Sequence, residues 1–367
     1  MKSKYRYVLP EIQDLLATKE LFAKAKSEPT RYSYADALLK LGEQNPHVVS
    51  LDADVSKSMK TTLFAAKFPE RSFNFGIAEQ NMMAAAAGMA TTGLIPFANT
   101  YAVFASMRAL DMVRNSIHYP RLNVKIAASH SGITPGPDGV THQAQEDLSI
   151  MRSIAGSTVI APADPTSTQM AVHAAAAYDG PVYLSFTRDP VPVLYDQTFP
   201  FQIGRAVLVR EGGDAAIIAN RDLVVQALIA AEMLARKGIE ARVIDCHTLK
   251  PLDEKMVLKA AKDTGAVVTA ENNIIYGGLG SAVAELLVEK HPIPMKRVGV
   301  GNTFAESGPY LEVIDKYGLT ARHIVKAVNE VLKRKPSGKV PVQAKTAIRS
   351  RAKTKKPKQK PRAGQKR

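Results

Sequence analysis

The sequence has 367 residues, which is enough for two globular domains of ordinary size with additional tails. Apolar residues make up 46% of it and Trp is absent, a composition that favours layered α/β domains over a β-sandwich. The single cysteine, Cys246, excludes an internal disulfide framework and suits a reducing compartment. The N-terminal segment lacks the apolar core of a secretory signal, and no apolar run approaches the length of a membrane span. We therefore expect a soluble, cytoplasmic protein with no membrane contact.

The net charge of +15 is concentrated at the C-terminus. Residues 336–367 contain 12 Lys or Arg and no Asp or Glu, so residues 1–335 carry only +3 of that charge. Like charges repel and this segment has little to bury, so we predict a disordered basic tail over residues 336–367. A solubilising role is the simplest interpretation, with weak contact to RNA or another polyanion as the alternative. No zinc-finger spacing, RNP motif or basic-aromatic platform accompanies the tail.

Residues 1–30 are mixed and charged, and they predict an N-terminal extension made of a short helix and a surface strap. From Arg31 onward, apolar runs alternate with helical stretches. Several of these runs are unbroken, which is typical of strands covered on both faces. The predicted strands of this part cover residues 48–53, 72–76, 94–99, 124–129, 158–161 and 182–186.

Helices are predicted between these strands. The stretch 77–92 is rich in Ala and Met and ends before Gly93, a residue that commonly follows a helix. Asp164 and Pro165 predict the start of another helix, because Asp can cap it and Pro fits its first position. This alternation of strands and helices indicates a parallel, doubly wound sheet.

Residues 190–201 are rich in proline and predict a linker to a second series of strands and helices. The fold class predicted from both series is α/β, with two doubly wound domains of mostly parallel sheets at residues 31–195 and 205–335. The predicted strands of the second domain cover residues 215–219, 241–246, 266–270 and 297–300, and its helices cover 223–237, 281–290 and 321–334.

Two motifs join predicted strands to helices. The first reads FNFGIAEQN and places Glu79 in the first turn of a helix, where the helix dipole favours an acid even without a catalytic role. The second reads TYAVF and carries Tyr101 and Phe104 three positions apart. These two rings are either core residues or a pair that could hold a flat heteroaromatic ring.

A third motif lies in a loop after an apolar strand, where α/β proteins bind ligands. The loop holds His130, Asp138 and His142. No third clustered His, Cys or carboxylate stands at metal-ligand spacing, so we predict no metal site and expect hydrogen bonds to a polar substrate. Arg31 and Arg188 would each be ordinary solvated residues if taken alone.

Combined, the segments GIAEQN at 76–81, IPFANTYAVF at 95–104 and DGVTHQ at 138–143 occur in the order and spacing found in the C-terminal half of transketolase. Over residues 30–335 the chain resembles this family, and especially its split form made of two chains. The resemblance implies a subunit that transfers a two-carbon ketol unit from a ketose phosphate to an aldose phosphate, as in the pentose phosphate pathway. It also implies thiamine diphosphate as the cofactor.

The resemblance implies a role for each residue at the cofactor. Glu79 matches the glutamate that contacts N1′ of the aminopyrimidine, and Tyr101 and Phe104 match the aromatic wall around that ring. Asp54 matches an acid near the cofactor at the subunit interface. Met107 stands where a third aromatic residue is often found, and its thioether can still pack against a ring.

The sugar-binding residues are implied in the same way. His130 and His142 match histidines that hydrogen-bond the sugar, and Asp138 matches an acid that binds a sugar hydroxyl. With Glu79, the two histidines are the expected catalytic residues. The expected sugar-phosphate clamp, in which the guanidinium groups suit bidentate contact, consists of Arg31, Ser58 and Arg188.

The chain departs from full-length transketolase in lacking the Gly-Asp-Gly motif and the downstream Asn that hold the metal and the diphosphate. It also leaves no room for that domain before Arg31. The resemblance therefore implies a separate N-terminal subunit that carries the diphosphate and Mg²⁺, or Ca²⁺ or Mn²⁺. Because the family's site lies between chains, a heterotetramer with two copies of each subunit is the expected assembly, acting on phosphorylated sugars.

Two other functions stay open. Half of a 1-deoxyxylulose-5-phosphate synthase, or of another thiamine-dependent carboligase, would share the GIAEQ motif, although that synthase has an arginine-bearing segment around the position of His130. A non-catalytic RNA-binding or regulatory protein on this fold would not need Glu79, His130 or His142. The GGLG stretch at 277–280 lacks the full spacing of a glycine-rich phosphate loop, so a tight turn is the simpler interpretation.

Overall fold

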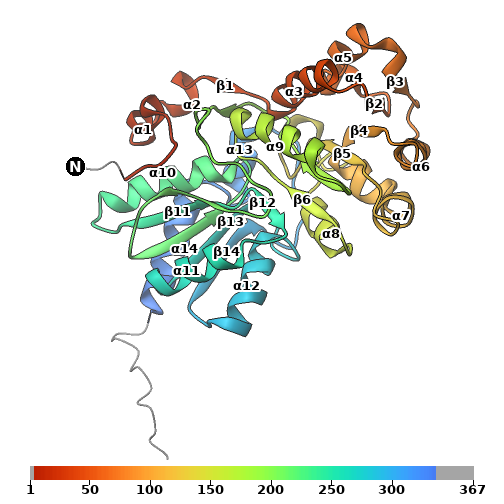
Figure 1. Cartoon of the computed structure of the whole chain (residues 1–367). Helices are drawn as coiled ribbons and strands as arrows, with labels where there is room; N and C mark the ends of the chain where they lie inside the picture. The colour runs from red at the N-terminus through yellow and green to blue at the C-terminus, as the bar shows by residue number, and fades with distance from the viewer. Residues whose placement is uncertain (1–3, 336–367) are drawn as a thin grey trace, which may run out of the picture. The chain divides into compact units, whose positions relative to one another are not determined.

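The computed structural model describes residues 4–335, and the predicted basic tail lies outside the described residues. The described chain forms one seven-stranded, one five-stranded and one two-stranded sheet, connected mostly by helices (Figure 1). The predicted α/β fold class is thus confirmed. Within residues 4–335, no helix is both long enough and apolar enough to cross a membrane.

The seven-stranded sheet is parallel except for β12, which pairs antiparallel with β6 at one edge. Its central strands are buried along their whole length, which explains their unbroken apolar sequence. In spatial order the strands are β12 (Thr248–Lys250), β6 (Thr158–Ile160), β7 (Val182–Ser185), β5 (Lys125–Ser129), β4 (Ile95–Tyr101), β2 (Val48–Asp52) and β3 (Ser72–Asn74).

Helices cover both faces of this sheet. One face packs against α3 (Thr30–Gln44) and α9 (Pro165–Ala177), and the other against α6 (Glu79–Ala90) and α8 (Asp147–Ser153). As predicted, Asp164 caps α9, forming a capping box with Ser167. The shorter helices are α4 (Ser56–Met59), α5 (Thr62–Lys67), η1 (Pro69–Arg71), η2 (Phe104–Arg108), α7 (Leu110–Met112), η3 (Val113–His118) and η4 (Gly136–Asp138).

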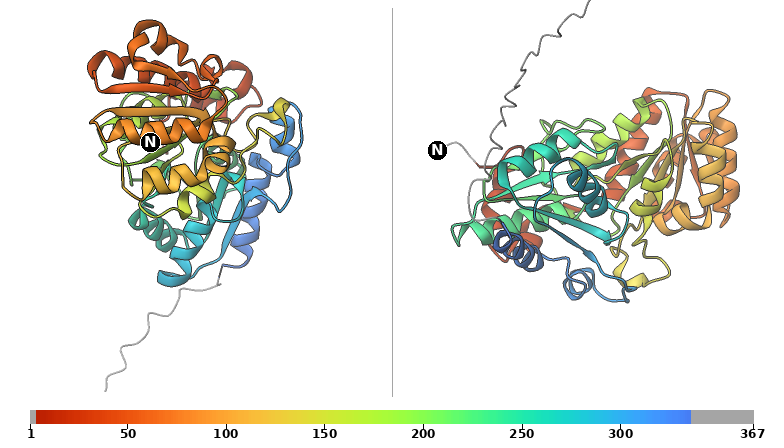
Figure 2. Two further views of the ribbon diagram at one scale, coloured as in Figure 1. Left: turned by 90° about the vertical axis from the view of Figure 1, so that its right-hand side faces the viewer. Right: turned by 90° about the horizontal axis from the view of Figure 1, so that it is seen from below.

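The five-stranded sheet is parallel except for β9 at one edge. Helices α10 and α14 cover one face and α11 and α12 the other, as the two views in Figure 2 also show. The strands in spatial order are β14 (Met295–Val300), β13 (Val267–Ile274), β10 (Ala215–Ala219), β11 (Ala241–Asp245) and β9 (Val207–Arg210), and the helices are α10 (Leu223–Ala235), α11 (Glu254–Thr264), α12 (Leu279–Lys290), α13 (Tyr310–Lys316) and α14 (Ala321–Lys333).

The N-terminal segment contains the expected helix, α1 (Pro10–Leu16), and a second short one, α2 (Leu21–Lys24). It is more than a surface strap, because Ile12 and Leu16 are buried in the core of the five-stranded sheet. Figure 1 shows α1 beside α10, which it contacts. The proline-rich segment at 190–201 pairs with the N-terminal segment through β8 (Val191–Pro192) and β1 (Ser27–Glu28).

All ten predicted strands are present, and most ends agree within one or two residues. The largest difference is at β13, which was expected to end at Ala270 but continues to Ile274. The extra residues include Glu271, Asn272 and Asn273, a polar run that does not resemble a buried strand. Burial of these polar side chains is explained by the groups that they meet, described below.

Candidate active site

The predicted site residues gather at the carboxyl edge of the seven-stranded sheet. Strands β2, β4 and β5 are parallel neighbours, so their carboxyl ends lie at one edge. Tyr101 ends β4, and His130 directly follows β5. Arg188 follows β7, the next parallel strand. This edge is where open α/β sheets place their ligands.

Glu79 is the first residue of α6 and is 1% exposed. Its carboxylate accepts hydrogen bonds from Arg108, whose Nη1 lies 3.1 Å from Oε1 and 3.0 Å from Oε2. The guanidinium of Arg108 also lies over the ring of Phe104, 4.2 Å from its centroid. Arg108 was not predicted from the sequence, and its spacing of four residues from Phe104 was the only available signal.

Four rings form a cluster beside this pair. Tyr101 and Phe104 stack with centroids 5.8 Å apart, and Tyr101 stacks on His130 at 3.8 Å. His142 meets Phe104 edge-on at 5.7 Å. Phe104 starts a π-helical turn, η2, a rare geometry that often marks functional sites. Met107 lies on the same turn and is 38% exposed, so it is available to a ligand.

The third group of residues is charged. Arg31 donates to Ser58 Oγ at 2.7 Å, so these two predicted site residues lie side by side. Arg188 forms ion pairs with Asp138 Oδ2 through Nε and with Asp189 Oδ1 through Nη1, each at 3.0 Å. Asp189 was not predicted, although it directly follows Arg188 in the sequence.

His130 stays neutral in this surrounding. Its Nε2 lies 3.9 Å from Asp138 Oδ2, and its Nδ1 lies 2.8 Å from Ser129 Oγ. Burial, followed by the positive charges of Arg31 and Arg188, lowers its pKa to about 2. A neutral imidazole can accept one hydrogen bond and donate another, which suits contact with sugar hydroxyls.

The environment of Arg31 favours an anion. Burial is the largest cause of its lowered pKa, and the nearby charge of Arg188 acts in the same direction. Its Nε is buried and has no hydrogen-bond partner among residues 4–335. A buried donor without a partner is costly, so a phosphate or sulfonate oxygen would stabilise this group.

Asp54 is not hydrogen-bonded to the residues of this cluster. It is exposed, with a backbone φ of 59°, and its amide donates to Asn74 Oδ1 at 3.1 Å. Among the described residues it forms no hydrogen bond with another predicted site residue. Its proposed role near a subunit interface depends on a second chain.

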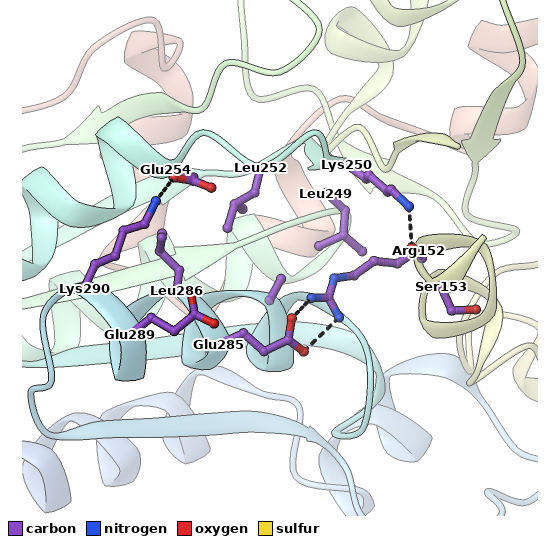
Figure 3. A pocket seen from close by; sticks show the side chains of 11 residues that line it. Arg152, Ser153, Leu249, Lys250, Leu252, Glu254, Glu285, Leu286, Glu289 and Lys290 are labelled. Atoms are coloured by element: carbon purple, nitrogen blue, oxygen red, sulfur yellow. Dashed lines mark hydrogen bonds and ion pairs between the residues drawn. The ribbon is translucent and has the colours of Figure 1, made fainter. Parts of the chain in front are cut away.

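A pocket of about 460 Å³ shares no residue with the candidate site (Figure 3). Several of its charges are paired within the chain: Arg152 with Glu285 and Lys290 with Glu254. Lys250 Nζ donates to the carbonyl oxygen of Arg152 at 2.8 Å. These charged groups are thus already bonded within the chain.

The backbone amides of the GGLG stretch at residues 277–280 are also bonded by a side chain of the same chain. Glu271 accepts hydrogen bonds from the backbone amides of Leu279 at 2.7 Å and Gly280 at 2.8 Å, the first turn of α12. A Cβ on Gly278 would lie 2.1 Å from Glu271 Oε2, so glycine is needed for this close approach. The carboxyl group of Glu271 thus occupies the position at the helix start where an anion could bind, and the tight-turn interpretation is favoured.

Two mostly parallel sheets covered by helices define an α/β protein, and its aromatic and charged cluster lies at the carboxyl edge of the larger sheet, where such folds commonly bind ligands. Sequence comparison is more specific. Residues 26–193 match the family model for the transketolase pyrimidine binding domain, and residues 204–324 match that for the transketolase C-terminal domain. The chain therefore belongs to the transketolase family.

Similar proteins include the 6-deoxy-6-sulfo-D-fructose transketolase subunit SqwH of Clostridium sp. (strain MSTE9), 45% identical over 83% of this chain and 95% of the relative. A 1-deoxy-D-xylulose-5-phosphate synthase of Geobacter sulfurreducens is 38% identical over 83% of this chain but only 49% of its own length. A solved structure described as a split gene transketolase, inactive beta4 tetramer, has 50% identity and a TM-score of 0.79, covering 84% of this chain and 99% of that one.

Membership of this family implies dependence on thiamine diphosphate, and the site fits the aminopyrimidine half of that molecule. The stacked rings of Tyr101 and Phe104 suit a flat heteroaromatic ring. Glu79 suits a ring nitrogen, because it is a buried carboxylate at a helix start. Among residues 4–335, no three His, Cys, Asp or Glu side chains are grouped so that they could hold a metal ion.

Proposed function

We propose that this chain is the pyrimidine-binding subunit of a two-chain transketolase, which transfers a two-carbon ketol unit between anionic sugars. The observation that carries the proposal is the placement of Glu79, the ring pair Tyr101–Phe104 and the histidines at one sheet edge. The charged group around Arg31 lies at the same edge, where the far end of a sugar would be bound. The proposed domains remain residues 31–195 and 205–335.

Thiamine diphosphate, when bound, supplies the carbanion stabilisation needed to break and form a carbon–carbon bond beside a ketone. In this proposal Glu79 holds a proton at a ring nitrogen, and Tyr101 and Phe104 orient the ring. His130 and His142 hydrogen-bond the sugar, and Asp138 binds one of its hydroxyls. Met107 and Asp54 complete the cofactor surroundings, the latter at the interface with a second chain.

The proposed substrate class is a ketose donor and an aldose acceptor that each carry a terminal anion. Arg31, Ser58 and Arg188 would hold that anion, because guanidinium groups bind phosphate and sulfonate oxygens through the same hydrogen bonds. The Clostridium relative is named for a sulfonated sugar, so both kinds of anion are reasonable. A pentose phosphate is the first substrate to test.

The diphosphate and Mg²⁺, or Ca²⁺ or Mn²⁺, would be held by a separate N-terminal subunit. The similarity to a split gene transketolase supports this, since that solved chain is described as an inactive tetramer. We propose a heterotetramer with two copies of each subunit, located in the cytoplasm. The chain alone is expected to be inactive.

The test is coupled ketol transfer from xylulose 5-phosphate to ribose 5-phosphate, with 6-deoxy-6-sulfofructose as a second donor. The chain is assayed with its partner subunit, thiamine diphosphate and Mg²⁺, and each subunit is also assayed alone. Activity only in the mixture, largely lost in Glu79→Gln but kept in the exposed-site control Glu70→Gln, supports the proposal. Activity of this chain alone would contradict it.

A second reaction, condensation of pyruvate with glyceraldehyde 3-phosphate, is worth measuring in the same mixture. The synthase relative is 38% identical over the matched region, so its chemistry is the main alternative. His130 favours ketol transfer, because its neutral imidazole lies where that synthase has an arginine-bearing segment. Pyruvate-dependent product without ketol transfer would replace the proposal by this alternative.

A further inference from the structure

The loop that carries Asp138 and His142 is closed at its base by its own first and last residues. Gly132 and Ala144 exchange two backbone hydrogen bonds, each 2.9 Å long. From this base the loop extends toward the five-stranded sheet. Many of its polar groups bond to one another or to Arg188 after β7. Ile133, Gly136 and the Gln143 side chain instead bond to β13 and to the segment that follows β14.

Strand β13 contributes the first contacts. Asn272 Oδ1 accepts from the amide of Ile133 at 3.0 Å, and the amide of Ile274 donates to the carbonyl oxygen of Gln145 at 2.7 Å. A Cβ on Gly132 would lie 2.4 Å from the carbonyl oxygen of Asn272, so the two backbones touch. These contacts explain why the polar end of β13 is buried.

The segment after β14, residues 301–310, contributes the next contacts. The amide of Gly308 donates to the carbonyl oxygen of Gly136 at 3.0 Å, and Gln143 Nε2 donates to the carbonyl oxygen of Glu306 at 3.2 Å. A Cβ on Gly136 would lie 2.4 Å from the carbonyl oxygen of Gly308. On Gly139 it would lie 2.3 Å from Ser307 Oγ. The turn around Asp138 thus rests directly on this segment.

The residues that contact the loop are themselves held by hydrogen bonds. Asn272 Nδ2 donates to Asp222 Oδ2 at 2.8 Å, and the hydroxyl of Tyr310 donates to the same oxygen. Asp222 follows β10 and is 2% exposed. Arg221 beside it donates to the carbonyl oxygen of Asn272 and, at 2.9 Å, to Ser185 Oγ at the end of β7.

Asn272 lies near the carboxyl end of β13, and Asp222 and residues 301–310 follow the carboxyl ends of β10 and β14. That edge is the usual ligand site of a parallel α/β sheet. Here a loop of the other sheet fills the place of a ligand. We propose that the five-stranded sheet positions the sugar-binding loop, with Asn272 and Tyr310 as positioning residues and Gly136 as the contact point. The inference rests on the proposed function for the identity of the substrate.

The mechanism of the effect is geometric. Asp138 and His142 lie on the loop, whereas Glu79, Tyr101 and Phe104 lie on other elements. A shift of the loop should therefore weaken sugar binding and turnover much more than binding of the cofactor, because the loop meets Tyr101 and Phe104 only through the edge-on contacts of His142. Misplacement of a binding group by about 1 Å can cost about 100-fold in rate.

The test uses Gly136→Ala and Tyr310→Phe in the full chain. Ala at position 136 keeps an ordinary backbone conformation but collides with Gly308, and Phe at position 310 removes one hydroxyl. The matched controls are Gly301→Ala, which has open space for its Cβ, and Tyr317→Phe, whose hydroxyl forms no hydrogen bond within residues 4–335. Neither control residue belongs to the proposed site.

Two readouts are measured. In the complex with its partner, kcat/KM for the phosphorylated sugar is expected to fall at least about tenfold in both variants, with the dissociation constant of thiamine diphosphate within twofold of wild type. In this chain alone, amide hydrogen exchange should become faster in residues 132–143 and stay unchanged in α6. Both controls should match wild type in both readouts.

Unchanged exchange in residues 132–143 in both variants would overturn the inference. So would an equal loss of sugar and cofactor binding, because that would indicate general destabilisation. If the wild-type complex shows no ketol transfer, the proposed function fails, but the exchange comparison still decides whether the second sheet holds the loop. Folding failure of Gly136→Ala leaves Tyr310→Phe to decide.

Discussion

Arg108 places one guanidinium nitrogen 3.0 to 3.1 Å from both carboxylate oxygens of Glu79. The pair is asymmetric, because the Glu79 side chain is 1% exposed and that of Arg108 is 46% exposed. A carboxylate buried at a helix start is thus held by a cation that remains in contact with solvent. Any ligand ring that approaches Glu79 must fit beside this cation and the ring of Phe104 beneath it.

Replacement of Arg108 by Met should destabilise the chain. Breaking a fully buried ion pair costs about 3–5 kcal/mol, and the exposure of Arg108 reduces this to about 1–2 kcal/mol. Urea denaturation of the chain alone measures the change. A double-mutant cycle with Glu79→Gln should show that most of the loss depends on Glu79. Arg114→Met, which removes an exposed arginine bonded to Asn115, is the control and should have little effect.

The neutral state of His130 predicts a pH dependence of stability. Its pKa is lowered to about 2 in the folded chain, while an unfolded histidine has a pKa near 6.5. Below about pH 6.5 only the unfolded state takes up this proton, so folding stability falls as the pH falls, by up to about 1.4 kcal/mol per pH unit. His130→Gln should reduce this slope between pH 4.5 and about 6.5, as measured by denaturation at several pH values.

The control for this pH series is His47→Gln, because His47 is exposed. It should leave the slope as in wild type. Loss of the stacking on Tyr101 in His130→Gln lowers stability equally at every pH. Only the change in the slope of stability against pH therefore reports on the protonation of His130. An identical slope in wild type and His130→Gln would show that the imidazole is protonated in the folded chain.

Removal of the proposed anion contact should depend on the substrate. Arg31→Met is expected to raise KM for a phosphorylated ketose about tenfold or more, because a charge-assisted hydrogen bond contributes about 1.5–3 kcal/mol. The same variant should change KM for the unphosphorylated ketose much less. Steady-state kinetics of the two-subunit complex measures both, with the exposed Lys57→Met on α4 as control. An equal rise in KM for the two sugars would show that residues other than Arg31 bind the anion of the substrate.

The cap on α12 predicts another pH effect. Burial raises the pKa of Glu271 to about 7, so between pH 4.5 and about 7 the folded chain keeps a proton that the unfolded chain loses. This contribution makes stability fall as the pH rises through that range. Glu271→Gln should reduce this slope, and should cost about 1 kcal/mol at pH 5 because its amide cannot accept from both backbone N–H groups.

The exposed Glu285→Gln on the same helix is the control for Glu271 and should follow the wild-type curve. Denaturation curves at pH 5, 6, 7 and 8 provide the comparison. Because Glu271 occupies this helix start, inorganic phosphate has no free site there. Calorimetry should therefore detect no difference in phosphate binding between wild type and Glu271→Gln. Phosphate binding that disappears in Gly278→Ala would contradict the assignment of Glu271 as the cap.

The sequence alone determined the strands and the family. Several of the ten predicted strands are unbroken apolar runs, because a strand that is covered on both faces shows no alternation of polar and apolar residues. Glu79, Tyr101 and His130 were found because each follows or ends a strand, and parallel strands bring such ends to one edge. Their roles came from the resemblance, which spacing alone could not supply.

Tertiary structure alone decided which side chains meet across the two sheets. Arg108 was not singled out from the sequence, and the π-helical turn that carries it places it on Glu79. The predicted strand ended at Ala270, because burial of the polar end of β13 depends on hydrogen bonds to Ile133 and Gln145, residues more than 100 positions away. Such pairings leave no local pattern, since a buried polar group is stable only beside a partner that the folded chain supplies.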